Sequence, residues 1–570
     1  MQLFGSLGSL LGFVTRHARG VRHVRLLAAL VIVAGIVNGL ANTVLIGVVN
    51  HVINAGGSPS ATYVWLFVGI CVVLPFARFG GDYLLVYLME RAALHLRMVM
   101  SRRILAAPLR KLEEVGSAGL LATLSTDIPT VTGMVAVLPL LCMNLTVVVG
   151  LLVYMGILSW KLLIGVVFFL VLAVFMYQYP LLRAQRHVGA MREKTDELFQ
   201  HFRAVTEAVK ELKLHHERRR TFLDERLERT AGEMAANSLA AQRLFAGAVS
   251  WGQVLVFVLV GLIAFAAPVY MPASREVLTG YVLAILFMVT PIQVVMNSVP
   301  QLSRAMASMR KVESLGLALD SATPAVPQRA GTAQAGWRSL ELAGITHSYR
   351  SERDQSSFTL GPVNLRFEPG QIVFLTGGNG SGKTTLAKLL TGLYTPESGE
   401  VLLDGEPVGP AELPRLYALF STVFSDFFLF DSLLGLEEQE LDGQAARYLE
   451  ELHLEHKVKV EGGRLSTTDL SQGQRKRLAL LTAYLEDRPI YLFDEWAADQ
   501  DPQFKQIFYN ELLPQLRARG KTVFAITHDD QYYGVADRFI KLDYGQVVFD
   551  SGTDVLPPES EGAAPDPAEQ

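Results

Sequence analysis

Six apolar runs, each near the length that crosses a lipid bilayer, constrain the fold of this chain more than any other feature. They occupy residues 26–49, 63–79, 134–158, 161–182, 245–267 and 277–296. A membrane-spanning helix needs about 20 apolar residues, and it satisfies its own backbone polar groups within the lipid. The first run follows too long a lead, with no small-residue cleavage site after it, to be a removable signal peptide. The sequence therefore predicts six membrane-spanning helices.

Positively charged residues predict how these helices are oriented. Four arginines precede the first span (Arg16, Arg19, Arg22 and Arg25), and Lys and Arg recur in the long segments after spans two and four. The other connections are nearly free of positive charge. Lys and Arg accumulate on the cytoplasmic side of membrane proteins, so we expect both termini in the cytoplasm. Residues 193–230 have almost no Gly or Pro and carry apolar positions three or four apart, which predicts helices that continue beyond the membrane.

Composition divides the chain into four segments. We predict a membrane domain over 1–318, a linker rich in Ala, Pro and Gly over 319–336, a soluble α/β domain over 337–556, and a disordered acidic tail over 557–570. The net charge of −4 provides no basic field, so nucleic acid is not an expected partner. Cys71 and Cys142 lie within apolar runs without metal-type spacing, and we expect them to be packing residues.

A glycine-rich stretch in the α/β domain carries the clearest chemistry. Residues 377–385 read GGNGSGKTT, between an apolar strand at 371–376 and a helical pattern. They satisfy G-x-x-x-x-G-K-[ST], in which the glycines let backbone N–H groups surround phosphate oxygens at a helix N-terminus. Lys383 is placed to bridge the β- and γ-phosphates, and the Thr384 hydroxyl to ligate Mg²⁺. The stretch therefore predicts a nucleotide phosphate site.

Two later strands end in polar residues that suit hydrolysis. The apolar strand in RPIYLFDEW (488–496) ends at Asp494 and Glu495, and TVFAIT (522–527) ends at His528. Asp494 is predicted to hold Mg²⁺, commonly through water, and Glu495 to polarise the attacking water. His528 would lie beside them, where it could sense a γ-phosphate. The alternatives are a helix N-cap for the acidic pair and a structural role for the histidine.

A second helix start suited to phosphate lies between these motifs. In DLSQGQRKRLALLTAYL (469–485), a polar turn opens directly into an amphipathic helix. A single nucleotide site has no obvious use for two such helix ends so far apart in the sequence.

The order and spacing of GGNGSGKTT, LSQGQ, LFDE and ITHDD resemble the ATPase domain of an ABC transporter. With six preceding spans, the whole chain resembles an ABC exporter half-transporter. The resemblance implies a polytopic α-helical membrane domain followed by an α/β P-loop ATPase domain. It also implies a homodimer, in which each ATP lies between residues 377–385 of one chain and 470–474 of the other. This arrangement would explain the two helix ends.

The same resemblance implies roles for individual residues. Glu495 would be the general base, His528 the switch histidine, Asp501 the interface aspartate and Tyr349 the adenine-stacking aromatic, with strand packing as the alternative for Tyr349. The cofactors would be ATP and Mg²⁺, with Thr384, Asp494 and Ser425 at the metal. The remaining predicted ATP-binding residues are Gly377, Gly378, Asn379, Gly380, Ser381, Gly382, Lys383, Thr385, Ser471, Gln472, Gly473 and Gln474.

Three departures from the usual family motifs indicate a branch. Ser425, in STVFSDFFLF (421–430), stands where the family usually has glutamine, LSQGQ replaces LSGGQ, and WAADQD (496–501) replaces SALD. This combination resembles cyclic-peptide exporters, including those of syringomycin-type lipopeptides and pyoverdine-type siderophore precursors. Ser425 would then act on Mg²⁺ or the attacking water indirectly. The alternative is that Ser425 only turns the chain between two apolar strands.

The leading functional hypothesis is ATP-driven export of a peptide-like product across the bacterial inner membrane. A lipid flippase or multidrug exporter shares the same ATPase motifs and stays an alternative. A third hypothesis, an ATP-gated membrane protein that does not pump, is disfavoured by the intact Glu495. Polar residues within the spans could contact substrate or other helices: Arg78, Asp82, Tyr177, Gln178, Tyr179, Gln293, Asn297 and Gln301.

Overall fold

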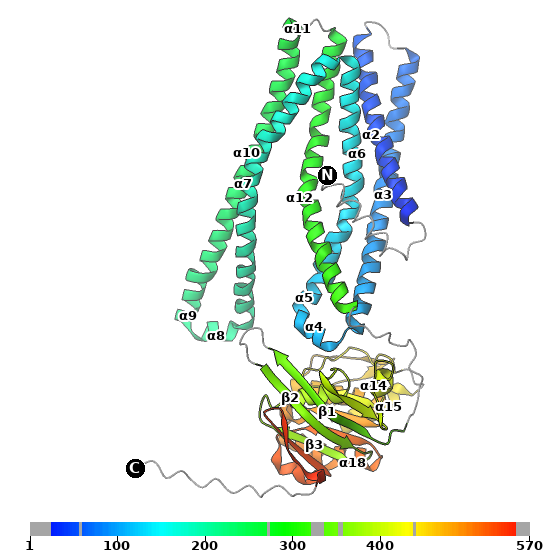
Figure 1. The fold of residues 1–570 in the computed structure, drawn as a ribbon, viewed down its shortest axis with the longest axis vertical. Helices are drawn as coiled ribbons and strands as arrows, with labels where there is room; N and C mark the ends of the chain where they lie inside the picture. The colour runs from blue at the N-terminus through cyan, green and yellow to red at the C-terminus, as the bar shows by residue number, and fades with distance from the viewer. Residues whose placement is uncertain are drawn as a thin grey trace. The chain divides into compact units, whose positions relative to one another are not determined.

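The structure is a computed structural model that describes residues 24–55, 60–270, 274–320, 336–350, 357–436 and 440–553. It separates into two compact units, residues 1–100 with 121–314, and residues 101–120 with 315–570. The first unit consists of long helices, and the second contains an α/β domain (Figure 1). The predicted tail at 557–570 lies outside the described residues. Most of the predicted linker at 319–336 does too, so the domain boundaries stay predictions.

The helices of the first unit confirm the predicted spans. Six helices within the described residues are long and apolar enough to cross a membrane. They are built on α2 (Val24–Asn54), α3 (Ala61–Ala106), α6 (Ile128–Leu158), α7 (Trp160–Glu207), α10 (Glu228–Gly261) and α12 (Arg275–Asp320). Shorter helical pieces connect them along the chain: α5 (Ser117–Ala122, mostly in the second unit), η1 (Thr123–Asp127), α8 (Val209–Leu214), α9 (His216–Thr221), η2 (Phe222–Leu227), η3 (Leu262–Ala266) and α11 (Ala267–Tyr270).

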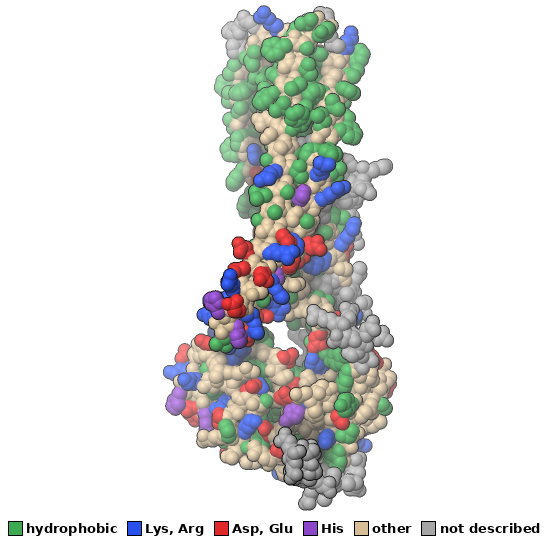
Figure 2. Space-filling model, turned by 90° about the vertical axis from the view of Figure 1, so that its left-hand side faces the viewer, with side chains coloured by type: hydrophobic (Ala, Val, Ile, Leu, Met, Phe, Trp, Pro, Cys, Tyr) green, Lys and Arg blue, Asp and Glu red, His purple; other side chains and the backbone are tan. Residues whose placement is uncertain are grey.

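Several of these helices extend well beyond a bilayer. α3 has 46 residues and α7 has 48, and helices of this length measure about 70 Å, against a hydrocarbon core of about 30 Å. Hydrophobic side chains gather at one end of the helical unit, and charged side chains gather over the extensions at the other end (Figure 2). Both cysteines are unpaired, and Cys71, predicted to be a packing residue, is exposed on α3 in the single chain.

Glycines let α2 and α6 approach each other closely. A Cβ on Gly39 of α2 would lie 2.9 Å from Cβ of Thr146, and a Cβ on Gly150 of α6 would lie 2.6 Å from Oγ1 of Thr43. Lipid supplies no hydrophobic force between helices, so close packing of small residues is a main source of their association. These contacts therefore define how α2 and α6 pair.

Buried hydrogen bonds add a specific connection between α2, α6 and α12. The Asn50 side-chain amide donates to the Tyr154 hydroxyl oxygen at 2.9 Å, and it accepts from the Thr279 hydroxyl at 2.8 Å. The buried Tyr281 hydroxyl on α12 lies 2.8 Å from the carbonyl oxygen of Met155 and 2.6 Å from that of Ser159. Polar side chains thus pair between helices at these positions, as expected for groups removed from water.

The α/β domain contains two larger sheets. The four-stranded sheet has the order β2-β1-β4-β5, from β1 (Leu340–Arg350), β2 (Ser357–Phe367), β4 (Ser398–Leu403) and β5 (Glu406–Pro407). The six-stranded sheet has the order β12-β11-β3-β10-β9-β6. Its strands are β3 (Ile372–Gly377), β6 (Phe420–Val423), β9 (Ile490–Asp494), β10 (Thr522–Ile526), β11 (Arg538–Asp543) and β12 (Gln546–Asp550). β7 (Val460–Glu461) and β8 (Arg464–Leu465) form a small separate pair.

Helices pack around these sheets. They are α13 (Lys383–Leu390), α14 (Leu413–Tyr417), α15 (Leu441–Glu451), α16 (Gln472–Glu486), α17 (Pro502–Ile507) and α18 (Leu513–Ala518), with single turns η4 (Trp496–Asp499), η5 (Phe508–Leu512), η6 (Asp530–Val535) and η7 (Ser551–Thr553). β3, β10, β9 and β6 run parallel, with Leu375 level with Ile526 and Ile526 level with Asp494. Their carboxyl ends therefore meet at one edge, where loops of α/β proteins bind ligands.

The second unit also includes a short helix from the segment between spans two and three. This helix, α4 (Leu109–Val115), lies against the α/β domain through side-chain ion pairs. Arg110 pairs with Glu397 at 2.9 Å, and Lys388 pairs with Glu113 at 2.8 Å. Tyr394 also donates a hydrogen bond to Glu113. α4 is thus anchored by charge, and Leu109 adds an apolar contact.

The close approach of α2 and α6 predicts a selective cost for one added methyl group. Gly150→Ala places a Cβ against Thr43 and should destabilise the helical unit by about 1–3 kcal/mol, as overpacking does. Gly165→Ala is the matched control, because a Cβ on Gly165 of α7 would meet no atom within 4 Å. Melting temperatures of the detergent-purified variants should fall for Gly150→Ala only. Equal melting temperatures would show that the two helices separate without cost.

Candidate functional site

The loop after β3 needs glycine at two of its positions. Gly377 has a φ of 146°, and a Cβ there would lie 2.0 Å from the carbonyl oxygen of Leu542. Gly382 has a φ of 100° at the start of α13, where a Cβ would lie 2.9 Å from the Leu360 side chain. Other residues would be strained and would clash. The fold therefore requires glycine at both ends of this loop, which wraps directly before the N-terminus of α13.

Within this loop, polar groups suit an anionic ligand. The Lys383 ammonium is 6% exposed and donates to the carbonyl oxygens of Gly377 at 3.0 Å and Gly378 at 3.1 Å. Burial lowers the pKa of Lys383. The nearby Glu495 and Asp494 carboxylates raise this pKa, but they offset the effect of burial only in part. The Ser381 hydroxyl is buried and has no hydrogen-bond partner. A buried ammonium hydrogen-bonded to loop carbonyls, together with an unpartnered hydroxyl, fits phosphate oxygens.

Asp494 is the centre of a second polar group. It is 1% exposed at the end of β9, and it accepts a hydrogen bond from the Thr384 hydroxyl at 3.1 Å and another from the Ser425 hydroxyl at 3.2 Å. Burial raises the pKa of the Asp494 carboxyl, whereas these two hydrogen bonds lower it. No group of three or more His, Cys, Asp or Glu side chains able to hold a metal occurs in the described part of the chain. Mg²⁺ suits such a site nonetheless, since it is commonly held by one carboxylate, phosphate oxygens and water.

Ser425 lies in a turn and also donates the hydrogen bond to Asp494. The chain turns directly after β6, where the Phe427 N–H donates to the Phe424 carbonyl oxygen at 3.3 Å. Residues 427–431 form no strand. The alternative interpretation of Ser425, a turn between two strands, is therefore correct about the turn but not about the second strand. The Ser425 hydroxyl reaches Asp494 directly, which the sequence did not indicate.

Glu495 has an unusual backbone and two polar neighbours. Its φ is 50° and its ψ is 35°, a left-handed conformation that costs a non-glycine residue about 1–2 kcal/mol. Its carboxylate lies 3.4 Å from Nε2 of His528 and 4.0 Å from Nζ of Lys383. The strand ends thus bring the loop lysine, the acidic pair and the histidine together, as predicted. Glu495 is 38% exposed, so water has access to it.

In the single chain, the LSQGQ segment contacts the loop that follows Glu495 and not the phosphate loop at 377–385. Ser471 caps α16, where its side chain accepts from the Gln474 N–H and the Gln474 side chain accepts from the Ser471 N–H. Gln472 donates to Asp499 at 3.3 Å, and the Gly473 carbonyl accepts from Gln500 at 3.0 Å. Among the described residues, no hydrogen bond or ion pair joins residues 471–474 to residues 377–385. Asp501, also predicted to bind ATP, caps α17 through the Phe504 N–H at 2.9 Å.

Tyr349 lies one strand away from the phosphate loop. On β1 it is level with Phe358 of β2, whose ring lies next to Gly382. Its hydroxyl donates to the Tyr394 hydroxyl at 2.8 Å, and its ring meets His347 edge-on at 5.3 Å. The position is compatible with stacking on a base and with strand packing, so both interpretations of Tyr349 stand.

Sequence reasoning missed two residues that contact the site's loops. Lys476, four residues after Gln472 on α16, is 3% exposed and donates to the Glu495 carbonyl oxygen at 2.8 Å. Trp496 is 1% exposed, and its indole N–H donates to the Lys476 carbonyl oxygen at 2.8 Å. A lysine within the polar RKR run gives no sequence signal of burial.

Comparisons with known proteins agree with this geometry. The ABC transporter model matches residues 360–498, and the ABC transporter transmembrane region model matches residues 25–293. The ATP-binding protein SyrD of Pseudomonas syringae pv. syringae is 36% identical over 91% of this chain and 93% of that protein. The chain belongs to the ABC transporter family. Its two matched regions make it an ABC exporter half-transporter, as predicted.

Another relative of this ABC transporter is named for a different activity. An ATP-dependent lipid A-core flippase of Ralstonia nicotianae is 27% identical over 86% of this chain and 83% of that protein. A solved structure of a bacterial Atm1-family ABC exporter with ATP bound has a TM-score of 0.69 and 17% identity, and it covers 93% of this chain and 95% of that chain. This likeness confirms the predicted fold class, and the family assigns ATP binding and ATP hydrolysis to this transporter.

Removing the Ser425 hydroxyl should affect this ABC transporter through Asp494. Ser425→Ala removes one hydrogen-bond donor to Asp494, so the pKa of the Asp494 carboxyl should rise further. As the pH is lowered, Asp494 should then be protonated at a higher pH than in the parent. We expect ATPase activity about tenfold lower, a raised Mg²⁺ requirement, and an acid limb of the pH–rate profile shifted to higher pH. The Kd for ATP without Mg²⁺ should be unchanged.

The control for this prediction is Ser421→Ala. Ser421 is buried on β6, the strand that precedes the turn with Ser425, but its hydroxyl donates to Glu486 at 2.9 Å. It should keep the parent pH profile and Mg²⁺ requirement. A Ser425→Ala protein with the same profile as Ser421→Ala would reduce Ser425 to a turn residue.

Proposed function

We propose that this transporter is a homodimer that uses ATP and Mg²⁺ to export a peptide-like product across the bacterial inner membrane. The product would be a cyclic peptide, a lipopeptide or a siderophore precursor, and both termini would lie in the cytoplasm. The observation that carries the proposal is the full-length similarity to SyrD at 36% identity. The departures at Ser425, LSQGQ and WAADQD, typical of the cyclic-peptide exporter branch, add support.

The separation of the two helix starts supports the dimer. Residues 471–474 make their contacts with the loop at 499–500, although their helix N-terminus suits phosphate. Pairing with residues 377–385 of a second copy would use both helix starts on one ATP. Each chain would then contribute to two sites.

The geometry supports a division of chemical roles at each site. ATP supplies the phosphoanhydride bond that is broken. Lys383 and the loop N–H groups would hold phosphate oxygens, while Thr384 and Asp494, with Ser425 donating to Asp494, would hold Mg²⁺. Glu495 would accept a proton from the attacking water, and His528, 3.4 Å from its carboxylate, would orient it. Tyr349 would stack on adenine and Asp501 would face the second copy.

A cavity in the helical unit supports an amphipathic product. It measures about 410 Å³ between α7, α10 and α12, and Gln293 and Asn297 are its amide residues among apolar neighbours. Ligand sites typically combine an apolar lining with a few polar groups that fix orientation. Arg78 and Asp82, the other predicted pair, lie 3.8 Å apart, and both are 71% exposed in the single chain. Gln178, Tyr179 and Gln301 are exposed as well.

A lipid flippase is the second candidate function, because lipid A-core flippases match most of this chain at 27% identity. A largely apolar cavity also suits an acyl chain. The two candidates differ in whether the transported head group is a peptide or a glycolipid.

The shared site predicts complementation between two inactive chains. Ser471→Arg blocks one helix start and Lys383→Ala removes the phosphate-binding ammonium, so each homodimer should lack ATPase activity. A mixed dimer would contain one intact site and one doubly damaged site, and we expect partial ATPase activity from doubly tagged, purified mixed dimers. Activity no higher than that of the two homodimers would contradict shared sites.

The substrate class predicts selective stimulation. In proteoliposomes, an acylated cyclic peptide should stimulate the ATPase and be transported, whereas a lipid A-core glycolipid and the unacylated peptide should do so less. Gln293→Leu with Asn297→Leu should raise the peptide concentration for half-maximal stimulation by about thirtyfold, since two lost polar contacts of about 1 kcal/mol each cost about 2 kcal/mol together. Basal ATPase should be unchanged, and Glu495→Gln should abolish transport. Stimulation by the glycolipid alone would favour the flippase.

A further inference from the structure

Glu495 is held on both sides of its left-handed backbone. Its N–H donates to the Ile526 carbonyl oxygen of β10 at 3.1 Å, and its carbonyl oxygen accepts from the Lys476 ammonium at 2.8 Å. The direction of a side chain follows the backbone that carries it. These two bonds therefore hold the backbone from which the Glu495 side chain extends, and a shift of that backbone would move the carboxylate.

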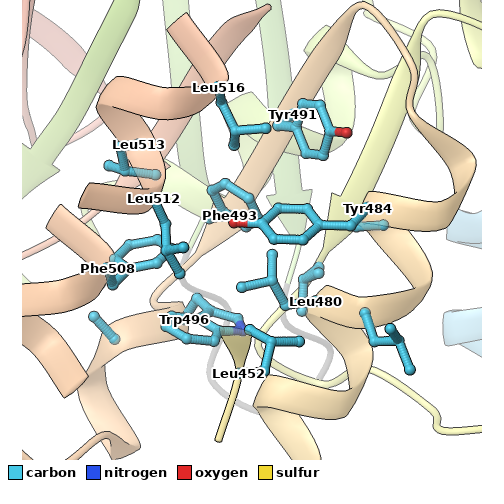
Figure 3. Close-up of a cluster of buried hydrophobic side chains, with 14 of the residues drawn as sticks. Leu452, Leu480, Tyr484, Tyr491, Phe493, Trp496, Phe508, Leu512, Leu513 and Leu516 are labelled. Carbon is cyan, nitrogen blue, oxygen red and sulfur yellow. The ribbon is translucent and has the colours of Figure 1, made fainter. Parts of the chain in front are cut away.

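The next residue is anchored independently. The Trp496 ring stacks on Phe508 with centroids 4.4 Å apart and lies among Leu452, Leu480 and Phe508 in the buried cluster shown in Figure 3. Its indole N–H donates to the backbone carbonyl of Lys476. Lys476 thus contacts both residues, through its own carbonyl to Trp496 and through its ammonium to Glu495.

Lys476 is itself held by charge. It lies 2.7 Å from the Asp499 carboxylate, which also accepts from Gln472 at the start of α16. Arg477 adds a parallel connection, because it donates to the Gln500 side chain at 2.8 Å and pairs with Asp501. The start of α16 and the loop at 495–501 therefore form one hydrogen-bonded unit.

We propose that Lys476 is a positioning residue for hydrolysis, which keeps the Glu495 carboxylate in line with the attacking water by holding the Glu495 carbonyl. The ammonium bonds to the backbone carbonyl oxygen of Glu495 and not to its carboxylate, so it acts only through the backbone. The proposal rests on the proposed role of Glu495 as the general base. Lys476, the middle residue of the RKR run at 475–477, would thus contribute to hydrolysis from outside the recognised motifs.

Lys521, the residue before β10, provides a matched control, because its partner Asp487 follows the last residue of α16. Lys521 is 16% exposed, donates to the Asp487 carbonyl oxygen at 2.8 Å and pairs with the Asp487 carboxylate at 3.0 Å. Asp487 is also left-handed, with a φ of 44°. Lys521 thus repeats the chemistry of Lys476 at a residue with no place in the nucleotide site.

The experiment measures ATPase kinetics of Lys476→Met in the full-length dimer, beside Lys521→Met and Glu495→Gln. Lys476→Met keeps the apolar stem but loses the donor. A carboxylate displaced by about 1 Å can cost about a hundredfold in rate, so we expect kcat to fall at least tenfold. The KM and Kd for ATP should stay within about threefold of the parent, since Lys383 and its loop are untouched. Lys521→Met should keep the parent kcat.

A second variant covers the case in which Lys476→Met does not fold, judged by its melting temperature and ATP binding. Lys476→Gln keeps a neutral donor on a shorter side chain and should give a kcat between those of the parent and Lys476→Met. A folded Lys476→Met or Lys476→Gln with parent kcat would overturn the proposal. So would equal losses in Lys521→Met, or a rise in KM that matches the fall in kcat.

The two proposals fail in different ways. If Glu495→Gln turned over ATP at nearly the parent rate, Glu495 would not be the general base. Lys476 would then have no catalytic carboxylate to position. An inactive Glu495→Gln beside a fully active Lys476→Met would leave the base in place and reject only the role of Lys476.

Discussion

The parallel pairing of β3, β10, β9 and β6 is the constraint on which the nucleotide site depends. Level register between Leu375, Ile526 and Asp494 brings the carboxyl ends of three strands to one edge. β3, β9 and β10 are buried along their whole length, and the polar residues of the site lie at or soon after their carboxyl ends. Lys383, Asp494 and His528 are far apart in the sequence. The strand pairing alone therefore places them together, and no specific contact between two of these side chains is needed.

This dependence explains why much of the site was predictable. Glycines, a lysine and a threonine at fixed spacing have a single physical use after a buried strand, and the acidic pair and the histidine follow strands of the same type. The membrane spans were predictable for a similar reason, since long apolar runs have one stable conformation in lipid. In both cases a local sequence pattern determines the local structure, and tertiary packing only needs to be compatible with it.

The remaining contacts depend on which surfaces meet, and no local pattern encodes that. Ser425 reads as a turn residue, and its contact with Asp494 exists because β6 pairs beside β9. Asn50 and Tyr281 read as isolated polar residues in apolar runs until α2, α6 and α12 are brought together. The charge contacts of α4 with Glu397 and Lys388 join residues more than 250 positions apart in the sequence. These pairings could not be predicted from spacing.

The contact of Lys476 with Glu495, the proposed general base, shows the same limit. A left-handed glutamate costs about 1–2 kcal/mol, and a hydrogen bond from a charged donor contributes about 1.5–3 kcal/mol, so one ammonium is enough to hold the backbone of Glu495. Burying that ammonium is itself expensive, and a buried ion pair is often no better for stability than apolar residues of similar size. Asp499, 38% exposed, keeps its contact with water and limits this cost. Stability alone therefore gives little reason for a lysine at this place, whereas the direction of the Glu495 carboxylate gives a specific one.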